Sequence, residues 1–207
     1  MARITPTGEM WHAIADGDLR TLERVVAQHR NLLDERPPIA GGTWLHLAVG
    51  EDSLDVVKFL VQCGLKVNEP STLDGDLPLV RAAANGKEDI AAFLLDAGSV
   101  MDTSASIRNP LFAAIVGRSP EVVRLLLKRG IDARVRYTSD TMRDMDATAF
   151  ALMRGETEIG GIIALHLACG DQSRAEALML EAQSIAAMHG PLKPMRIIPT
   201  DEDLAGE

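Results

Sequence analysis

Two near-identical strings in this sequence place a histidine among apolar residues. LHLA occurs at 45–48 and again at 165–168, with an acidic residue a few positions after each histidine. Histidine titrates near neutral pH, so His46 and His166 could act as general acids or bases. Such chemistry also needs an activated nucleophile or further ligands at metal-binding spacing. The sequence contains no CxxC, HExxH, GxSxG or GKS/GKT string that would supply either of them.

The other residues capable of chemistry are scattered. Cys63 and Cys169 lie in apolar helical patterns, where cysteine serves as a small hydrophobic residue. The remaining histidines are far apart in the sequence, and the adjacent acids at 51–52 and 201–203 are typical of solvated charge. We therefore expect no catalytic residue, no metal site and no cofactor. The repetition of the LHLA string itself is the more informative signal, because repeated strings mark stacked architectures.

Composition limits the partners and the fold class. Of 207 residues, 46% are hydrophobic but only 3% aromatic, and leucine and alanine dominate, which favours an all-α fold. Thirty acidic against 21 basic side chains give a net charge of −9, which disfavours nucleic acid and anionic membranes and favours a basic protein partner. The N-terminal stretch lacks the apolar core of a secretory signal, and no run is long enough to span a bilayer. These features predict a cytoplasmic protein.

Three segments align without gaps and reveal a repeat. They begin at Trp44, Pro78 and Pro110, at intervals of 34 and 32 residues, and each is followed after twenty residues by a glycine. Every unit contains a short alanine-rich helix and a second helix with a Val/Leu stripe. Ser53 and Ser119 are expected to cap the second helices. Such a unit cannot bury its apolar faces alone and must stack on copies of itself.

These units resemble ankyrin repeats. The family pattern of a turn, Thr-Pro-Leu-His, an alanine-rich helix, a Val/Leu helix and a closing glycine is matched by GTWLHLA at 42–48, DGDLPL at 74–79 and PL at 110–111. Trp44 replaces the usual proline, while Asp52 and Arg118 replace the mid-repeat glycine. The resemblance implies a solenoid of about five helix-turn-helix units with degenerate ends. It also implies a hydrogen bond between Thr43 and His46 that locks the turn.

The repeat period predicts the organisation of the chain. We expect an array over 1–190, with clear units at about 39–70, 73–104 and 105–134 and degenerate units at about 5–38 and 144–190. In the last unit, 148–153 is the expected first helix, 159–169 its partner and 172–188 a capping helix. A competing alignment makes 164–168 a first helix, but its offset of 120 residues from the first LHLA string is not a multiple of the period. The acidic stretch at 191–207 is predicted to be a flexible tail.

Contact positions of the repeat family carry over to the loop tips and first helices. The link at 134–146 is longer than the others and holds the only tyrosine, three arginines and two methionines, residue types that suit protein interfaces. A packed insertion loop is the equal alternative for this link. The predicted partner-binding residues are Glu51, Asp74, Asp76, Asn85, Arg108, Arg134, Arg136, Tyr137, Met142 and Arg143.

The sequence therefore favours a non-enzymatic module that is monomeric when unbound and recognises one protein through its concave face and this link. By analogy with bacterial immunity proteins on this scaffold, the partner would be a basic toxin or effector domain that the module inhibits. One alternative is a small-ligand protein or enzyme with a pocket near His166 or His46. Another is a structural adaptor whose leucine- and alanine-rich last helix pairs with a second copy.

Overall fold

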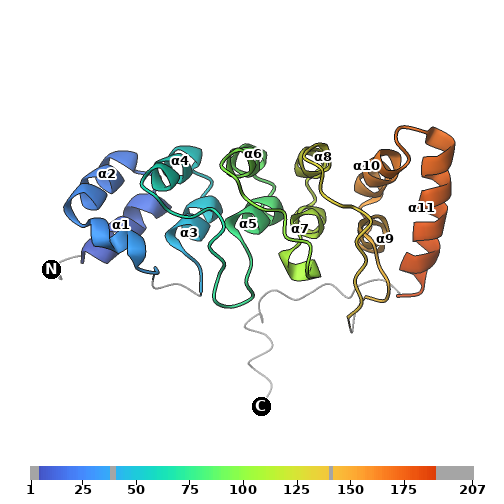
Figure 1. Cartoon of the computed structure of the whole chain (residues 1–207), viewed down its shortest axis with the longest axis horizontal. Helices are drawn as coiled ribbons and strands as arrows, with labels where there is room; N and C mark the ends of the chain where they lie inside the picture. Colours follow the sequence, from blue (N-terminus) through green and yellow to red (C-terminus); the bar gives the residue numbers. More distant parts are fainter. Residues whose placement is uncertain (1–4, 38–40, 140–141, 190–207) are drawn as a thin grey trace, which may run out of the picture.

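A computed structural model describes residues 5–37, 41–139 and 142–189 of this chain. The described residues form five helix pairs in a single stack, followed by one long helix at the end (Figure 1). The first helices of the pairs form one row, the second helices form the other, and the connecting loops project from the side of the first row. This arrangement is the all-α solenoid that the repeat pattern predicts.

The helices of the five pairs are short and regularly spaced. The first helices are α1 (Pro6–Ala15), α3 (Trp44–Gly50), α5 (Pro78–Ala84), α7 (Pro110–Val116) and α9 (Ala147–Met153). The second helices are α2 (Leu19–Gln28), α4 (Leu54–Gln62), α6 (Glu88–Asp96), α8 (Pro120–Lys128) and α10 (Thr157–Leu167). The terminal helix is α11 (Gln172–Ala187).

One continuous apolar core runs through the stack. The second residue of three successive first helices is a leucine with no exposed surface: Leu45, Leu79 and Leu111. The Val/Leu stripes of the second helices face the same core. Of the two predicted serine caps, the Ser119 hydroxyl accepts a hydrogen bond from the Val122 backbone N–H, whereas the Ser53 side chain makes no capping bond.

Small residues let the first helices approach one another closely. Gly117 ends α7, and a Cβ atom added there would overlap the backbone carbonyls of Ala83 and Ala84 at the end of α5. The alanine-rich first helices therefore bring neighbouring backbones into direct contact. This close spacing sets the distance between successive loops.

Two residues that replace the mid-repeat glycine keep its backbone conformation. Asp52 and Arg118 have φ angles of 61° and 53°, in the left-handed region that non-glycine residues rarely adopt. Gly17, Gly86 and Gly155 occupy the same turn in the other pairs, with φ between 66° and 80°. The turn geometry is thus imposed by the stack and does not depend on glycine.

At the C-terminal end, the helices follow the alignment in which 148–153 is a first helix. His166 lies on α10, a second helix, so the second LHLA string is not a repeat of the first in structural position. Helix α11 packs against both α9 and α10 and runs across the end of the stack (Figure 1). The predicted tail at 191–207 lies outside the described residues.

Candidate functional site

The loops that precede the first helices are held together in a row. The Thr72 backbone N–H donates to the Gly41 carbonyl at 2.8 Å, which joins the loops before α3 and α5. The Asn68 amide donates to the Gly98 carbonyl at 2.9 Å, and its oxygen accepts from the Val100 N–H at 2.9 Å. These bonds run from one repeat to the next. The loops consequently form one supported surface along the stack.

His46 fastens this row to the helices. Its Nδ1 accepts from the Thr43 backbone N–H at 3.1 Å and lies 2.9 Å from the Thr43 hydroxyl, and its Nε2–H donates to the Asp76 carbonyl at 3.1 Å. The Thr43–His46 bond implied by the resemblance is therefore present. The ring has no exposed surface and both nitrogens are engaged, so His46 has no free nitrogen for a substrate.

Burial shifts the titration of this pair. It lowers the pKa of His46, although the bond to the Asp76 carbonyl and the Asp76 charge act in the opposite direction. Burial also raises the pKa of Asp76, whose carboxyl lies 3.9 Å from both His46 Nε2 and Arg81. A neutral His46 with its proton on Nε2 matches the observed hydrogen bonds.

Several predicted contact residues are exposed along the stack. Glu51 and Asn85 end successive first helices, and both side chains are solvent-exposed. Asp74 lies at a loop tip, where one carboxylate oxygen accepts from the Ser71 hydroxyl at 2.6 Å. Arg108, in the next loop, is half-buried beside Gly75 and pairs with Asp102 at 3.5 Å. Asp74 and Arg108 therefore belong to neighbouring loops, whereas Glu51 and Asn85 lie where the first helices turn into the second helices.

Three other predicted contact residues are turned toward the protein interior. Asp76 is only 7% exposed and Met142 only 9%. Tyr137 is half-buried: its hydroxyl donates to the Thr103 carbonyl at 2.7 Å and accepts from the Asn109 amide at 3.0 Å. Its ring contacts Phe112 edge to face. In this structure the three side chains support the loops, which is the packed alternative considered for Tyr137.

The long link is a hairpin. Tyr137 and Met145 exchange two backbone hydrogen bonds of 3.0 Å, the only β-type pairing in the part of the chain that the structure describes. The Arg143 backbone N–H donates to His189 Nε2 at 2.8 Å, while His189 Nδ1 donates to the Ile185 carbonyl. These bonds attach the hairpin to the end of α11.

The predicted arginines of the link have different environments. Arg136 pairs with Asp144 at 2.6 Å, Asp146 at 3.2 Å and Glu181 at 3.8 Å, and the bond to Asp144 is the main cause that raises its pKa. The exposed side chain of Arg134 lines a pocket between the link, α9 and α11. Arg143 is exposed on the hairpin. The arginines therefore do not form one patch.

Two exposed loop-tip residues were missed by reasoning from the sequence. Leu73 is 73% exposed and Ile107 is 58% exposed, at the tips of the loops before α5 and α7. In the sequence, an isolated hydrophobic residue in a polar loop is only a weak indication of an interface. It becomes informative when the structure shows that the loop tip is exposed. Both side chains add apolar surface to the face that carries Asp74 and Arg108.

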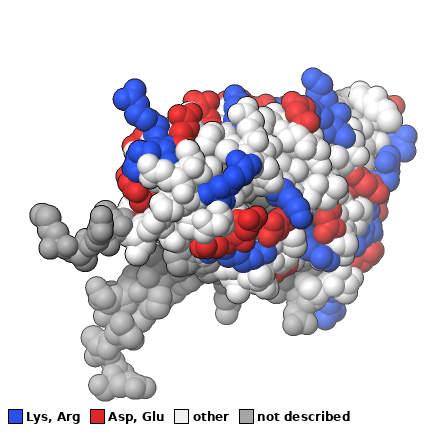
Figure 2. All heavy atoms as spheres, turned by 60° about the vertical axis from the view of Figure 1, so that its left-hand side comes forward, with Lys and Arg blue, Asp and Glu red and all other residues white. Residues whose placement is uncertain are grey.

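Charge is mixed over the molecular surface. Figure 2 shows basic and acidic side chains interspersed on the face that it presents. Many of these charges pair between neighbouring repeats, as in Lys87 with Asp52 at 2.7 Å and Arg129 with Asp96 at 2.8 Å. Glu51 makes no ion pair with any described residue. The net negative charge is therefore not gathered into one acidic patch on this face.

His166 and His46 do not share a site. His166 is exposed on α10 beside an apolar hollow that includes Leu127, Ile162 and Leu165, whereas His46 is buried in α3. No group of three or more potential metal ligands occurs within the described ranges. None of the helices described is long and apolar enough to cross a membrane.

Comparison with known proteins agrees with this architecture. A sequence model of ankyrin repeats, comprising three copies, matches residues 10–105 and 45–137. A protein of Rickettsia felis whose name describes it as an ankyrin repeat protein is 32% identical over 120 residues, which cover 49% of this chain and 53% of that relative. The chain thus spans about half the length of the bacterial relative it matches.

Proposed function

Because this chain belongs to the ankyrin repeat family, whose repeats form protein-protein interaction modules, we propose that it inhibits one specific protein by binding it along the loop row and the 134–146 link. We propose that the binding array spans residues 1–190. The partner would be a basic toxin or effector domain, and this chain its immunity protein. Ankyrin repeats generally act as non-enzymatic scaffolds, so inhibition would result from covering the partner's surface.

The observation that carries the proposal is the exposure of apolar side chains on a supported surface. Leu73 and Ile107 are largely exposed at loop tips that hydrogen bonds hold in place. A loop whose backbone is held before binding loses little conformational entropy when a partner covers it. Two neighbouring apolar anchors with polar surroundings match the usual anatomy of a protein interface.

Charges around these anchors favour a basic partner. Glu51, at the end of α3, and Asp74, at a loop tip, are both exposed, and Glu51 is free of ion pairs with described residues. Arg143 on the hairpin adds positive charge at the other end of the row, whereas Arg108 lies beside Gly75 and is paired with Asp102. A partner with basic groups opposite the second and third repeats, and an acidic group opposite the hairpin, would fit this order of charges.

The proposal is tested by binding to a defined partner. The candidate is any toxin-like protein encoded beside this gene, co-produced with the chain and assayed for rescue of growth. The double variant Leu73→Asp/Ile107→Asp should weaken binding at least a hundredfold, because it places two charges in the buried centre of the interface. Rescue of growth should be lost in parallel.

The matched control is Leu180→Asp. Leu180 is 66% exposed on α11, away from the loop row, so its replacement has a similar chemical change without the proposed contact. Binding should stay within about twofold of wild type. Equal loss in the control and the double variant, or full binding by the double variant, would contradict the proposed surface.

A further inference from the structure

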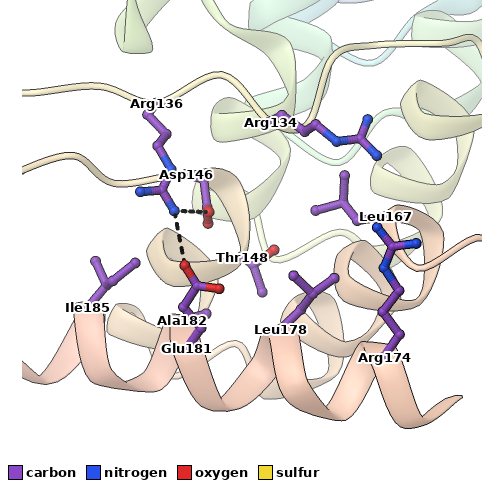
Figure 3. A pocket seen from close by; sticks show the side chains of 10 residues that line it. All are labelled: Arg134, Arg136, Asp146, Thr148, Leu167, Arg174, Leu178, Glu181, Ala182 and Ile185. Carbon is purple, nitrogen blue, oxygen red and sulfur yellow. Dashed lines mark hydrogen bonds and ion pairs between the residues drawn. The ribbon is translucent and has the colours of Figure 1, made fainter. Parts of the chain in front are cut away.

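The last repeat contains a small pocket, which the link helps to line through Arg134, Arg136 and Asp146. It has a volume of about 270 Å³ and lies between the link, α9, the end of α10 and one side of α11 from Arg174 to Ile185 (Figure 3). This volume is just below the range of roughly 300 to 1,000 Å³ typical of sites for drug-sized ligands. Any ligand must therefore be small. Its walls combine arginine side chains with the apolar Leu167, Leu178 and Ile185.

Two guanidinium groups in this pocket lack an acidic partner. Arg134 extends from the link and Arg174 from the first turn of α11, and their ends come toward one another beside Leu167 (Figure 3). Within the described ranges neither side chain forms a salt bridge. Two positive charges that share a small pocket repel each other. An anion bound between them would attract both and offset this repulsion.

The acidic side chains of the pocket are already paired. Asp146 accepts a hydrogen bond from Arg136 at 3.2 Å, and Glu181 forms an ion pair with Arg136 at 3.8 Å, as the dashed lines in Figure 3 show. Asp146 also caps α9 by accepting from the Ala149 N–H at 2.9 Å. Arg136, Asp146 and Glu181 thus form a closed group on one side of the pocket. This group has a net charge of −1, so the pocket lining as a whole, with Arg134 and Arg174, has a net charge of +1. Neither of these two arginines has an acidic partner among the described residues.

A buried hydroxyl points to the same kind of ligand. Thr148 is 2% exposed, and its Oγ1 makes no hydrogen bond to any residue that the structure describes. It lines the pocket between the link and α11, with its oxygen on the side of Leu167 (Figure 3). Thr148 is the second residue of α9, the position that a fully buried leucine holds in α3, α5 and α7. An unsatisfied hydroxyl at a leucine position costs stability and needs a partner.

We propose that this pocket binds a small organic anion. Arg134 and Arg174 would hold its carboxylate or phosphate group, Thr148 would donate one hydrogen bond to it, and a short aliphatic body would pack on Leu167 and Leu178. Guanidinium groups recognise both carboxylate and phosphate through paired N–H bonds. The apolar wall favours an organic anion over a bare inorganic ion.

Titration calorimetry with butyrate, acetate and inorganic phosphate tests the site directly on the full chain. Butyrate should bind saturably, with a Kd in the millimolar range or tighter, and several-fold more tightly than acetate because its additional methylenes are buried. Phosphate that binds more tightly than butyrate would overturn the assignment of an aliphatic body. Absence of saturable binding by all three probes would overturn the site.

Variants of the pocket residues distinguish binding at this site from non-specific binding of anions elsewhere on the protein. Arg174→Gln should weaken butyrate binding about tenfold or more, and Thr148→Val about fivefold, because each removes one hydrogen bond to the anion. Arg20→Gln is the matched control, since Arg20 is exposed on α2 at the opposite end of the stack and should leave binding unchanged. Amide chemical shifts should change near 134–136, 148 and 174–185. Equal loss in Arg20→Gln and Arg174→Gln would overturn the proposal.

Discussion

The second and last repeats differ in how their first helices pack against the element that follows them. In α3, Leu45 fills the core, and His46 reaches across to the loop of the next repeat. In α9 the equivalent residues are Thr148 and Ala149, and α11 stands where another repeat would continue the stack. The internal repeat is closed by its neighbour on each side. The terminal repeat retains a polar cavity.

This difference shows that the side chain needed at a given position of a first helix depends on whether the repeat is internal or terminal. An internal first helix must fill the space to the next repeat, so α3, α5 and α7 all have leucine at this position, and in α3 a histidine also holds the next loop. A terminal first helix faces a single helix of different orientation. Its core position tolerates a hydroxyl, and the pocket beside Thr148 is the result. Four substitutions test this contrast, in order of decreasing effect.

Leu45→Thr gives the first helix of the second repeat the threonine that Thr148 provides at the same position in the last repeat. Leu45 has no exposed surface, so the change removes apolar volume and buries a hydroxyl without a partner. The free energy of unfolding should fall by about 3 kcal/mol in urea titrations. Leu73→Thr, at an exposed loop tip, should change it by less than about 0.5 kcal/mol. A loss under about 1 kcal/mol for Leu45→Thr would mean that internal repeats are as tolerant as the last one.

His46→Ala removes the connection between α3 and the next loop. The loss of its bonds to Thr43 and Asp76 should lower the free energy of unfolding by about 2 kcal/mol. Amide exchange should rise most in the loop at 65–77. Unchanged exchange in that loop would show that His46 stabilises only its own helix.

The pH dependence provides a second readout for His46. The folded protein holds the pKa of His46 below its ordinary value of 6.5, so the unfolded chain binds more protons as the pH falls through that value. The stability contributed by His46 is therefore fully present above pH 6.5 and decreases below it. Wild type should lose stability from pH 7.5 to 5.5 more steeply than His46→Ala. Parallel curves for the two proteins would contradict a lowered pKa.

Thr148→Val should stabilise the unliganded protein. The two side chains have the same shape, and valine removes the buried hydroxyl that has no partner among the described residues. The expected gain is about 1 kcal/mol in buffer without phosphate or carboxylate. Saturating butyrate should reduce or reverse this gain, because only threonine can bond to the anion. Destabilisation in the absence of ligand would indicate that the hydroxyl already has a structural role.

Gly161→Ala tests the packing of α10 in the last repeat. A Cβ atom at this position meets nothing within 4 Å, so alanine should stabilise the helix by about 0.5 to 1 kcal/mol. At the adjacent Gly160, a Cβ would lie 3.1 Å from Leu152, and the same change should give no gain. Melting temperatures of the two variants provide the comparison. A larger gain at Gly160 would show that the last repeat is loosely packed throughout.

Much of the fold could be predicted from the sequence because each repeat carries its own signals. The near-constant interval of 34 and 32 residues between Trp44, Pro78 and Pro110, with closing glycines, identified the helix pairs without knowledge of their packing. The bond between Thr43 and His46 was expected from a local pattern and is present. Local periodicity could therefore predict the stack, and it favoured the observed helices at the C-terminal end.

The site was harder to predict, since it depends on contacts between distant segments. The sequence left an interface role and a packed role equally open for Tyr137, whose hydroxyl bonds to Thr103 and Asn109 across 28 to 34 residues. The pocket combines Arg134, Thr148 and Arg174 from three elements, and nothing in their spacing indicates that they meet. Thr148 could have been recognised as unusual only by aligning it with Leu45, Leu79 and Leu111.

The hydrogen bonds between adjacent loops also influence how the chain folds. Each helix pair packs mainly against the pairs next to it, so the chain closes short loops before it makes any distant contact. Low contact order of this kind is associated with rapid folding, and a stack can grow outward from whichever pair forms first. The central pairs, supported on both sides, would exchange their amides most slowly. The hairpin and α11 would unfold locally before the rest. A ligand bound in the last repeat would therefore stabilise the least stable part of the molecule.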